Sequence, residues 1–244
     1  MVVLININEN KRLKMTLKDW IESSYLSIEN IIMNSSSDNV DKKGDDAMID
    51  EPIGISHNCE PSLLYKLINS SKEKKNMVLT AFRVQNDGRR RGNCPVNRNS
   101  ICSILSKKNI NNANMGNNFY WRLLDTKFVI SPEGNGIDCH RHWEALYFGA
   151  IPIVERNEEM EKKLIGLPVL YTTDYSEINE TYLKNIYDKM INTEYDFSRL
   201  MIQCYPKKSM ELMIRRSNHW NGRRGKPLFY KVCLDSIIPN FYKE

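Results

Sequence analysis

The stretch that most limits how this chain can fold runs from Lys127 to Glu155. It opens with the apolar segment Phe128–Ile130, passes through a turn-forming loop into a helical pattern over Asp138–Phe148, and closes with Ile151–Val154. Strand, loop, helix and strand in this order predict a βαβ unit, which belongs in a parallel sheet covered by helices. Ligands of such sheets bind beside the carboxyl ends of the strands. We therefore expect any ligand beside the loop that follows the first strand.

The residues of that loop suit a phosphate group. Gly134 and Gly136, on either side of Asn135, would let the backbone adopt positive φ and approach a ligand closely. The free N–H groups at the start of the next helix form an anion site, strengthened by the helix dipole. We expect Asp138 to cap that helix.

Two side chains of the helix extend this chemistry. Arg141 and Glu144 are three residues apart, so they share a helical face. A guanidinium can bind a diphosphate through paired hydrogen bonds, and a carboxylate can accept two hydrogen bonds from a ribose diol. The alternative is a surface ion pair that contributes about 0.3–0.5 kcal/mol. His140 and His142 are two residues apart and cannot share a face as metal ligands, so we expect both at the solvent or at the rim of a site.

The segment 131–154 resembles the signature of the exostosin-like glycosyltransferases, including those of large DNA viruses and algae. That signature is roughly Pro-x-Gly, a few residues, Arg-x-x-Glu-Ala-Leu, two residues, Gly, and an apolar Pro-Val or Pro-Ile pair. The residues that fit it are Pro132, Gly134, Arg141, Glu144, Ala145, Leu146, Gly149, Pro152 and Val154. Glu133 departs from it, because the relatives usually carry arginine there. The resemblance extends weakly over residues 52–191.

This resemblance implies a GT-B fold, whose C-terminal Rossmann-like half binds a nucleotide-diphosphate sugar. It implies that Arg141 holds the donor phosphates and Glu144 the ribose, and that the sugar passes to a hydroxyl group of a glycan or glycoprotein. Such enzymes generally need no metal and no cofactor besides the donor substrate, and the chain has no Asp-x-Asp motif. Glu133 is the candidate general base, and its alternative role is a loop carboxylate that accepts a hydrogen bond from a backbone N–H.

Three consecutive arginines follow another predicted strand, Met77–Phe82. They belong to the loop Arg83–Gly92, which leaves the same edge of the sheet as the Gly134 loop. We expect one of them to reach the donor phosphates and place Arg90 among the candidate site residues; a solvated loop is the alternative. A nucleic-acid partner is not expected, because no aromatic residues are interleaved and no further basic cluster lies nearby.

The rest of the chain predicts one Rossmann-like domain with a short extension. With 244 residues the chain is too short for both halves of a GT-B enzyme. We expect residues 1–51 to form a helix over Thr16–Met33 and an acidic linker, and residues 52–244 to form the nucleotide-sugar-binding domain. Further helices are expected over 61–70, 98–107, 119–125, 158–165, 181–191, 197–214 and 227–238, and we expect Asn157 to cap the helix over 158–165. A further strand is expected over 167–171, where Pro168 indicates either the start of the strand or an edge position.

Composition bears on the cellular location, the state of the cysteines and the kind of ligand. No apolar segment is long enough to cross a membrane and the N-terminus lacks the pattern of a signal peptide, so we expect a cytoplasmic protein. The six cysteines show no zinc spacing and are expected as reduced thiols. A net charge of +5 is accounted for by an anionic ligand. Two function classes remain open: a glycosyltransferase, and a silent or truncated relative that only binds nucleotide-sugar or needs a partner chain to supply the acceptor domain.

Overall fold

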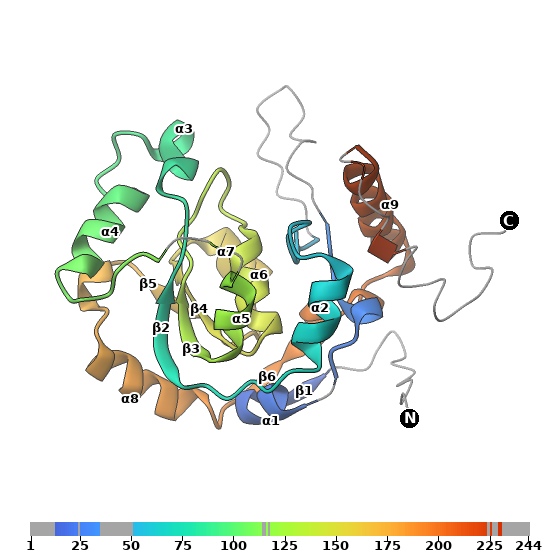
Figure 1. Ribbon diagram of the computed structural model, residues 1–244, viewed down its shortest axis with the longest axis horizontal. Helices are drawn as coiled ribbons and strands as arrows, with labels where there is room; N and C mark the ends of the chain where they lie inside the picture. Colours follow the sequence, from blue (N-terminus) through green and yellow to red (C-terminus); the bar gives the residue numbers. More distant parts are fainter. Residues whose placement is uncertain are drawn as a thin grey trace, which may run out of the picture.

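The computed structural model describes residues 13–23, 25–34, 51–113, 116, 118–223, 225 and 229–230. Within them the chain forms the predicted α/β fold, a parallel sheet flanked by helices (Figure 1). The four strands of this sheet lie in sequence order and are β2 (Asn76–Thr80), β3 (Thr126–Ile130), β4 (Ile151–Glu155) and β5 (Leu170–Thr172). A separate antiparallel pair consists of β1 (Lys14–Thr16) and β6 (Glu194–Asp196).

Helical segments connect these strands. The α-helices are α1 (Leu17–Glu22), α2 (Pro61–Ile68), α3 (Gly88–Arg91), α4 (Arg98–Ser106), α5 (Phe119–Leu124), α6 (His140–Tyr147), α7 (Glu158–Lys163), α8 (Glu180–Met190) and α9 (Lys207–Arg223). Short 3₁₀ turns are η1 (Ile28–Asn30), η2 (Val84–Asp87), η3 (Tyr175–Glu177), η4 (Phe197–Leu200) and η5 (Ile202–Cys204). The predicted cap of α7 is confirmed, because the Asn157 side chain accepts hydrogen bonds from the first turn.

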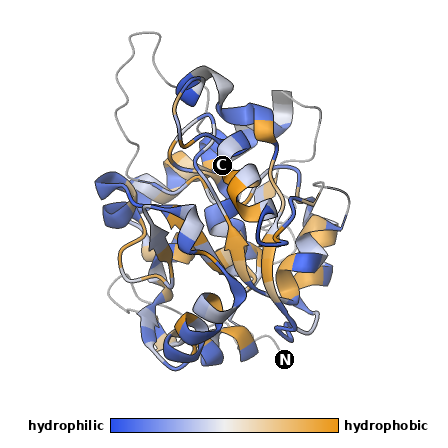
Figure 2. Ribbon diagram, turned by 90° about the vertical axis from the view of Figure 1, so that its left-hand side faces the viewer, coloured by the Kyte–Doolittle hydropathy of each residue, from blue (hydrophilic) through white to orange (hydrophobic). Residues whose placement is uncertain are grey.

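The central strands read as unbroken apolar runs because the sheet is covered by helices. Val78 of β2 pairs with Phe128 of β3, and Ile153 of β4 pairs with Leu170 of β5. Of the two positions that Pro168 indicated, the edge is the one found, because β5 is the last strand of the sheet and begins two residues after Pro168. Apolar residues colour the strands and the inner helix faces, and hydrophilic residues lie mostly on the outside (Figure 2). Because neighbouring strands are parallel, the carboxyl ends of all four strands lie at one end of the sheet.

The N-terminal helix predicted over Thr16–Met33 is wrong beyond its first turns. The helix α1 ends at Glu22, and the chain then continues largely in extended form. Tertiary contacts replace the helical hydrogen bonds beyond Glu22, because Ile32 N–H donates to the Tyr147 hydroxyl at 3.0 Å. Within α1, Trp20 stacks on Phe197 with ring centroids 4.4 Å apart. The Trp20 indole N–H also donates to the carbonyl oxygen of Leu146 at 2.9 Å.

The described N-terminal residues pack on the same core as the sheet. Ile31, Ile32 and Met33 are buried, and Ile55 N–H donates to the Ile32 carbonyl oxygen at 2.8 Å. The predicted domain division after residue 51 stays a prediction, because most of the acidic linker lies outside the described residues. The predicted helix over 227–238 also lies mostly outside them. No helix of the described part of the chain has the length and apolar character needed to cross a membrane.

Candidate functional site

The loop between β3 and α6 lies at the carboxyl end of the sheet, which Figure 1 shows at the top beside α3. His142 holds this loop from inside. Its Nδ1 lies 2.7 Å from Ser131 Oγ and its Nε2 lies 3.1 Å from the Ile137 carbonyl oxygen. A carbonyl oxygen only accepts, so Nε2 carries the proton and Nδ1 accepts from the serine hydroxyl. Burial lowers the pKa of His142 to about 4, so the imidazole is neutral at pH 7.

The expectation of a solvent or rim position is therefore wrong for His142, whose side chain is fully buried. His140 is half-buried, and its Nδ1 lies 2.8 Å from the Gly54 carbonyl oxygen. The physical reason is that α6 is buried all round, so its polar positions also face protein. Helical spacing alone does not reveal this.

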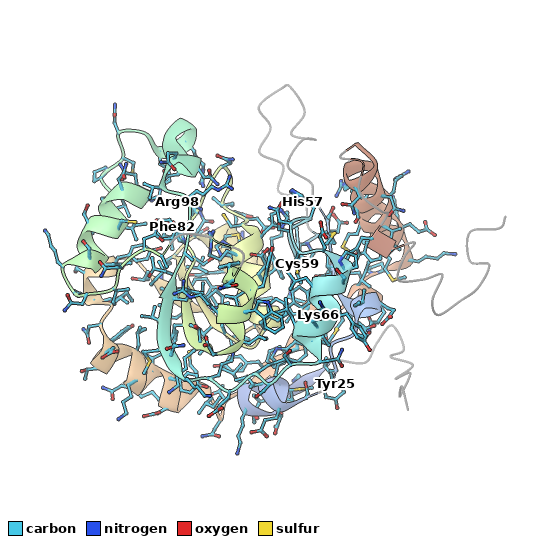
Figure 3. All side chains as sticks on the ribbon, viewed as in Figure 1. Tyr25, His57, Cys59, Lys66, Phe82 and Arg98 are labelled. Carbon is cyan, nitrogen blue, oxygen red and sulfur yellow. The ribbon has the colours of Figure 1, made fainter. Side chains whose placement is uncertain are left out.

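Arg98, the first residue of α4, joins the loops that follow β2 and β3. Its Nε donates to the Glu133 carbonyl oxygen at 2.8 Å, and its Nη2 donates to that of Pro132 at 3.0 Å. Its Nη1 donates to the Arg83 carbonyl oxygen at 2.8 Å. Figure 3 shows Arg98 beside Phe82, whose ring centroid lies 5.3 Å from the guanidinium carbon. This buried guanidinium therefore holds the loop after β2 against the loop after β3.

The glycines of the loop serve packing within the protein. The predicted positive φ is wrong for Gly134 and Gly136, because the described glycines with positive φ are Gly54, Gly149, Gly166 and Gly225. A Cβ on Gly134 would lie 2.8 Å from Arg98 Nη2, so the missing side chain makes room for a guanidinium of the chain itself. Gly136 and Asn135 are exposed at the tip of the loop.

Asp138 does not cap α6, which corrects another prediction. The N-cap residue of α6 is Cys139, and its side chain makes no capping hydrogen bond. Asp138 Oδ1 accepts from the Trp143 indole N–H at 2.7 Å, and Oδ2 lies 2.7 Å from Lys163 Nζ. Two buried donors thus hold this carboxylate between α6 and α7, away from the helix end.

Arg141 and Glu144, which we call the α6 pair, are the second and fifth residues of α6. Their side chains are buried, at 8% and 3% exposure, so the alternative of a surface ion pair is wrong. Glu144 Oε1 accepts from the Tyr120 hydroxyl at 3.0 Å and from Ser56 N–H at 3.2 Å. The Arg141 guanidinium lies 5.9 Å from the centre of the Phe119 ring. Burial lowers the pKa of Arg141 and Glu144 opposes that shift, but arginine remains charged in proteins.

The Glu144 carboxylate acts on its neighbours. Burial raises the pKa of Tyr120 and of Cys59, and in both cases the Glu144 charge adds to that increase. Figure 3 places Cys59 beside α2. The α6 pair thus offers a guanidinium and a carboxylate in a low-dielectric setting, where charge–charge interactions are stronger than in water.

The other charged group, which we call the Glu133 cluster, comprises Glu133, Arg90, Arg91 and Glu155. Arg90 Nη1 lies 2.7 Å from Glu133 Oε2, and Arg91 approaches the two oxygens of Glu155 at 2.9 and 2.7 Å. Glu133 N–H donates to Glu155 Oε2 at 2.9 Å. Burial raises the pKa of Glu133, Arg90 opposes this shift, and Glu155 adds to it. The alternative of a solvated arginine loop is wrong for Arg91, whose side chain is largely buried against Glu155. Arg90 is exposed and pairs with Glu133 from the solvent side of the loop.

Four of the predicted site residues therefore fall into two pairs, and Arg98 binds the Glu133 carbonyl oxygen of one pair. Arg141 lies with Glu144, and Arg90 lies with Glu133. Sequence reasoning missed Arg98, although an arginine in the first turn of a helix opposes the helix dipole and so marks a position held by other contacts. Sequence reasoning also missed Tyr120 and Ser56. No local pattern indicates them, because they lie 24 and 88 residues from Glu144 in the chain.

Within the described residues, no three His, Cys, Asp or Glu side chains gather as they would around a metal ion. The exostosin-like resemblance of residues 131–154 stays a prediction drawn from those residues. No protein-family model matches this sequence, and no curated protein matches it.

Proposed function

We propose that this chain is the donor-binding domain of a glycosyltransferase of the exostosin-like kind. It binds a nucleotide-diphosphate sugar at the carboxyl end of β2–β4 and transfers the sugar to a hydroxyl group of a glycan or glycoprotein. The observation that carries the proposal is the α6 pair, a buried guanidinium and a buried carboxylate beside the edge where parallel sheets bind ligands. Buried ionised groups are costly to maintain, and a functional site is one setting that retains them.

Arg141 is the proposed ligand of the diphosphate, and Glu144 that of the ribose hydroxyls. Two donors, Tyr120 and Ser56, already bind one oxygen of Glu144. A carboxylate offers about four acceptor positions, so capacity remains for a diol. The protein donors also fix the carboxylate's orientation before a ligand arrives, which lowers the entropy cost of binding.

Glu133 is the proposed general base. The acceptor oxygen forms a bond to the anomeric carbon, the bond from that carbon to the diphosphate oxygen breaks, and the nucleoside diphosphate leaves with the electron pair. The hydroxyl proton passes to Glu133. A carboxylate with a raised pKa holds a proton better at neutral pH. A donor diphosphate would compete with Glu133 for Arg90, so one guanidinium would stabilise the leaving group and release the base.

A second candidate function is a relative that binds nucleotide-sugar without transferring it, or that needs a partner chain. The observation that favours it is that several polar side chains of the site already have hydrogen-bond or ion-pair partners within the protein. All three guanidinium nitrogens of Arg98 donate to carbonyl oxygens, and Glu133 is ion-paired with Arg90. Fewer hydrogen-bonding groups are then available to a substrate than in a site whose polar side chains lack partners within the protein.

Thermal unfolding with UDP, GDP, CDP and their sugars tests donor binding. A ligand at about 100 times its Kd stabilises by about 2.7 kcal/mol, which corresponds to about 5–10 °C in Tm for a chain of this size. We expect one nucleotide to give this shift in the wild type and in Arg156→Met, an exposed arginine after β4. Arg141→Met and Glu144→Gln, once shown to be folded by circular dichroism, should lose it. No shift with any nucleotide would refute donor binding by this chain.

Transfer is tested separately from binding. Release of nucleoside diphosphate in the presence of sugar acceptors should fall at least about a hundredfold in Glu133→Gln, which retains the nucleotide-dependent Tm shift. A full rate in this variant would show that Glu133 is not the base. Donor binding without release by the wild type would favour the second candidate.

A further inference from the structure

A second polar site lies at the opposite end of the sheet, where β2 begins. A cleft of about 560 Å³ is lined by residues of α1, of the segment 70–74 that leads into β2, and of the last turns of α2 and α8. Figure 1 shows α1 and α8 along the bottom of the molecule, away from α3 and the β3–α6 loop. Three lysines line the cleft: Lys18, Lys72 and Lys74.

Lys72 is the unusual member of this lining. Its side chain is 8% exposed, and among the described residues its ammonium makes no hydrogen bond or ion pair. Burial alone lowers its pKa to about 8, because no carboxylate opposes the shift. The Nζ atom is not among the sealed polar atoms that lack a partner, so it opens on the cleft. Buried charges in proteins are ordinarily paired, and this one faces a space in which a partner can be bound.

Lys74, in the same segment, differs from Lys72 because its ammonium group has hydrogen-bond partners within the protein. Its Nζ donates to the carbonyl oxygens of Leu123 and Phe148 at 2.8 and 2.6 Å. These carbonyls end α5 and α6, where a cation is favoured by both helix dipoles. Lys74 is therefore used by the fold, and burial followed by the charge of Lys72 lowers its pKa. The carboxylate of Asp125 opposes this shift.

The acidic residues around the cleft do not neutralise it. Glu73 lies 3.0 Å from Lys75, to which it is paired at the surface. Glu22 of α1 also lines the cleft, as does Lys18 of the same helix. Two carboxylates therefore face three lysines of the lining, and one of the carboxylates is already paired. The cleft favours an anion.

The remainder of the lining determines the shape of that anion. Apolar side chains of α1, α2 and α8 face the same space, including Ile21, Ile68 and Tyr187. Inorganic phosphate would use only the cationic part. We propose that the cleft binds a small organic anion, whose carboxylate or phosphate group pairs with Lys72 and whose apolar body packs on Ile21, Ile68 and Tyr187. This site is independent of the proposed donor site.

Titration calorimetry and NMR of protein labelled at the lysine ε-carbon test the site. The probes are phenyl phosphate and benzoate, with benzyl alcohol as the neutral match and inorganic phosphate as the match without an apolar body. We expect phenyl phosphate or benzoate to bind and to raise the titration midpoint of Lys72 above its ligand-free value. Binding of both indicates a general anion site, and binding of one identifies the head group. Inorganic phosphate should bind at least about tenfold more weakly than the aromatic anion.

Two variants control the test. Lys72→Met retains the volume of the stem and removes the unpaired charge, so it should fold and lose at least about tenfold in affinity. Lys66→Met, on the exposed face of α2, should bind as the wild type does. Equal binding of benzyl alcohol, unchanged affinity in Lys72→Met, or no binding of either aromatic anion would overturn the proposal. None of these results bears on nucleotide binding at the other end of the sheet.

Discussion

Replacement of Gly134 by alanine tests why the β3–α6 loop carries a glycine. The φ of Gly134 lies outside the left-handed region, so the backbone accepts an L side chain. The obstacle is Arg98 Nη2, which would lie 2.8 Å from the new Cβ, well short of the 3.4 Å at which ordinary contact begins. We expect Gly134→Ala to destabilise the protein by displacing this guanidinium.

The magnitude follows from the contacts of Arg98. Moving Nη2 breaks at least its 3.0 Å hydrogen bond to the Pro132 carbonyl oxygen. A hydrogen bond that involves a charged group contributes about 1.5–3 kcal/mol, and alanine regains about 0.4–1 kcal/mol by restricting the unfolded chain. Gly134→Ala should therefore lower the free energy of unfolding by about 1–2 kcal/mol.

Urea unfolding followed by far-ultraviolet circular dichroism measures the effect in a double-mutant cycle. In an Arg98→Met background the added Cβ has room, so Gly134→Ala should there be neutral or stabilising by up to about 1 kcal/mol. Gly136→Ala is the matched control, because its Cβ would meet nothing closer than the Asp138 carbonyl oxygen at 3.9 Å. An equal cost of Gly134→Ala in both backgrounds would refute the packing explanation.

Two further predictions concern buried side chains. The pKa of His142 is lowered from 6.5 to about 4 on folding, so the unfolded chain binds its proton first as the pH falls. Stability should therefore decrease between these two pH values by about 3 kcal/mol, and urea titrations at each pH should show this loss in the wild type and not in His142→Gln. Trp20→Phe removes the donor to the buried Leu146 carbonyl oxygen and should cost about 1–3 kcal/mol, whereas the same change at the exposed Trp121 should cost less than about 0.5 kcal/mol. Equal losses at the two tryptophans would contradict this account.

The sheet was predictable because its signals are local. Apolar runs such as Phe128–Ile130 and Ile151–Val154 are followed by turn residues and by amphipathic helices, and each boundary depends on neighbouring residues in the chain. Asn157 capped α7 as predicted, since a cap needs only the next three residues. The helix expected over Thr16–Met33 ends at Glu22, and residues beyond it bond to distant parts of the chain, as Ile32 N–H does to the Tyr147 hydroxyl.

The candidate site was predictable only in outline. The three-residue spacing placed Arg141 and Glu144 on one face of α6. Arg90 was placed at the same edge because its loop follows the carboxyl end of a strand in the parallel sheet. Spacing gives no account of burial, so the alternative of a surface ion pair could be removed only by the structure. Asp138 was misassigned because its partner Lys163 lies on another helix, 25 residues further along the chain.

By itself the sequence determined the α/β class, the parallel sheet and the edge at which charged side chains gather, because periodicity and turn chemistry act over a few residues. The order of the strands came from the structure. Only the tertiary structure decided what each charge contacts. Arg98 occupies the space left by Gly134, Glu133 binds Arg90, and Lys72 is buried beside a cleft with no partner among the described residues. These outcomes depend on which surfaces exclude water after distant segments pack, and the free energy of a buried charge is determined by that packing.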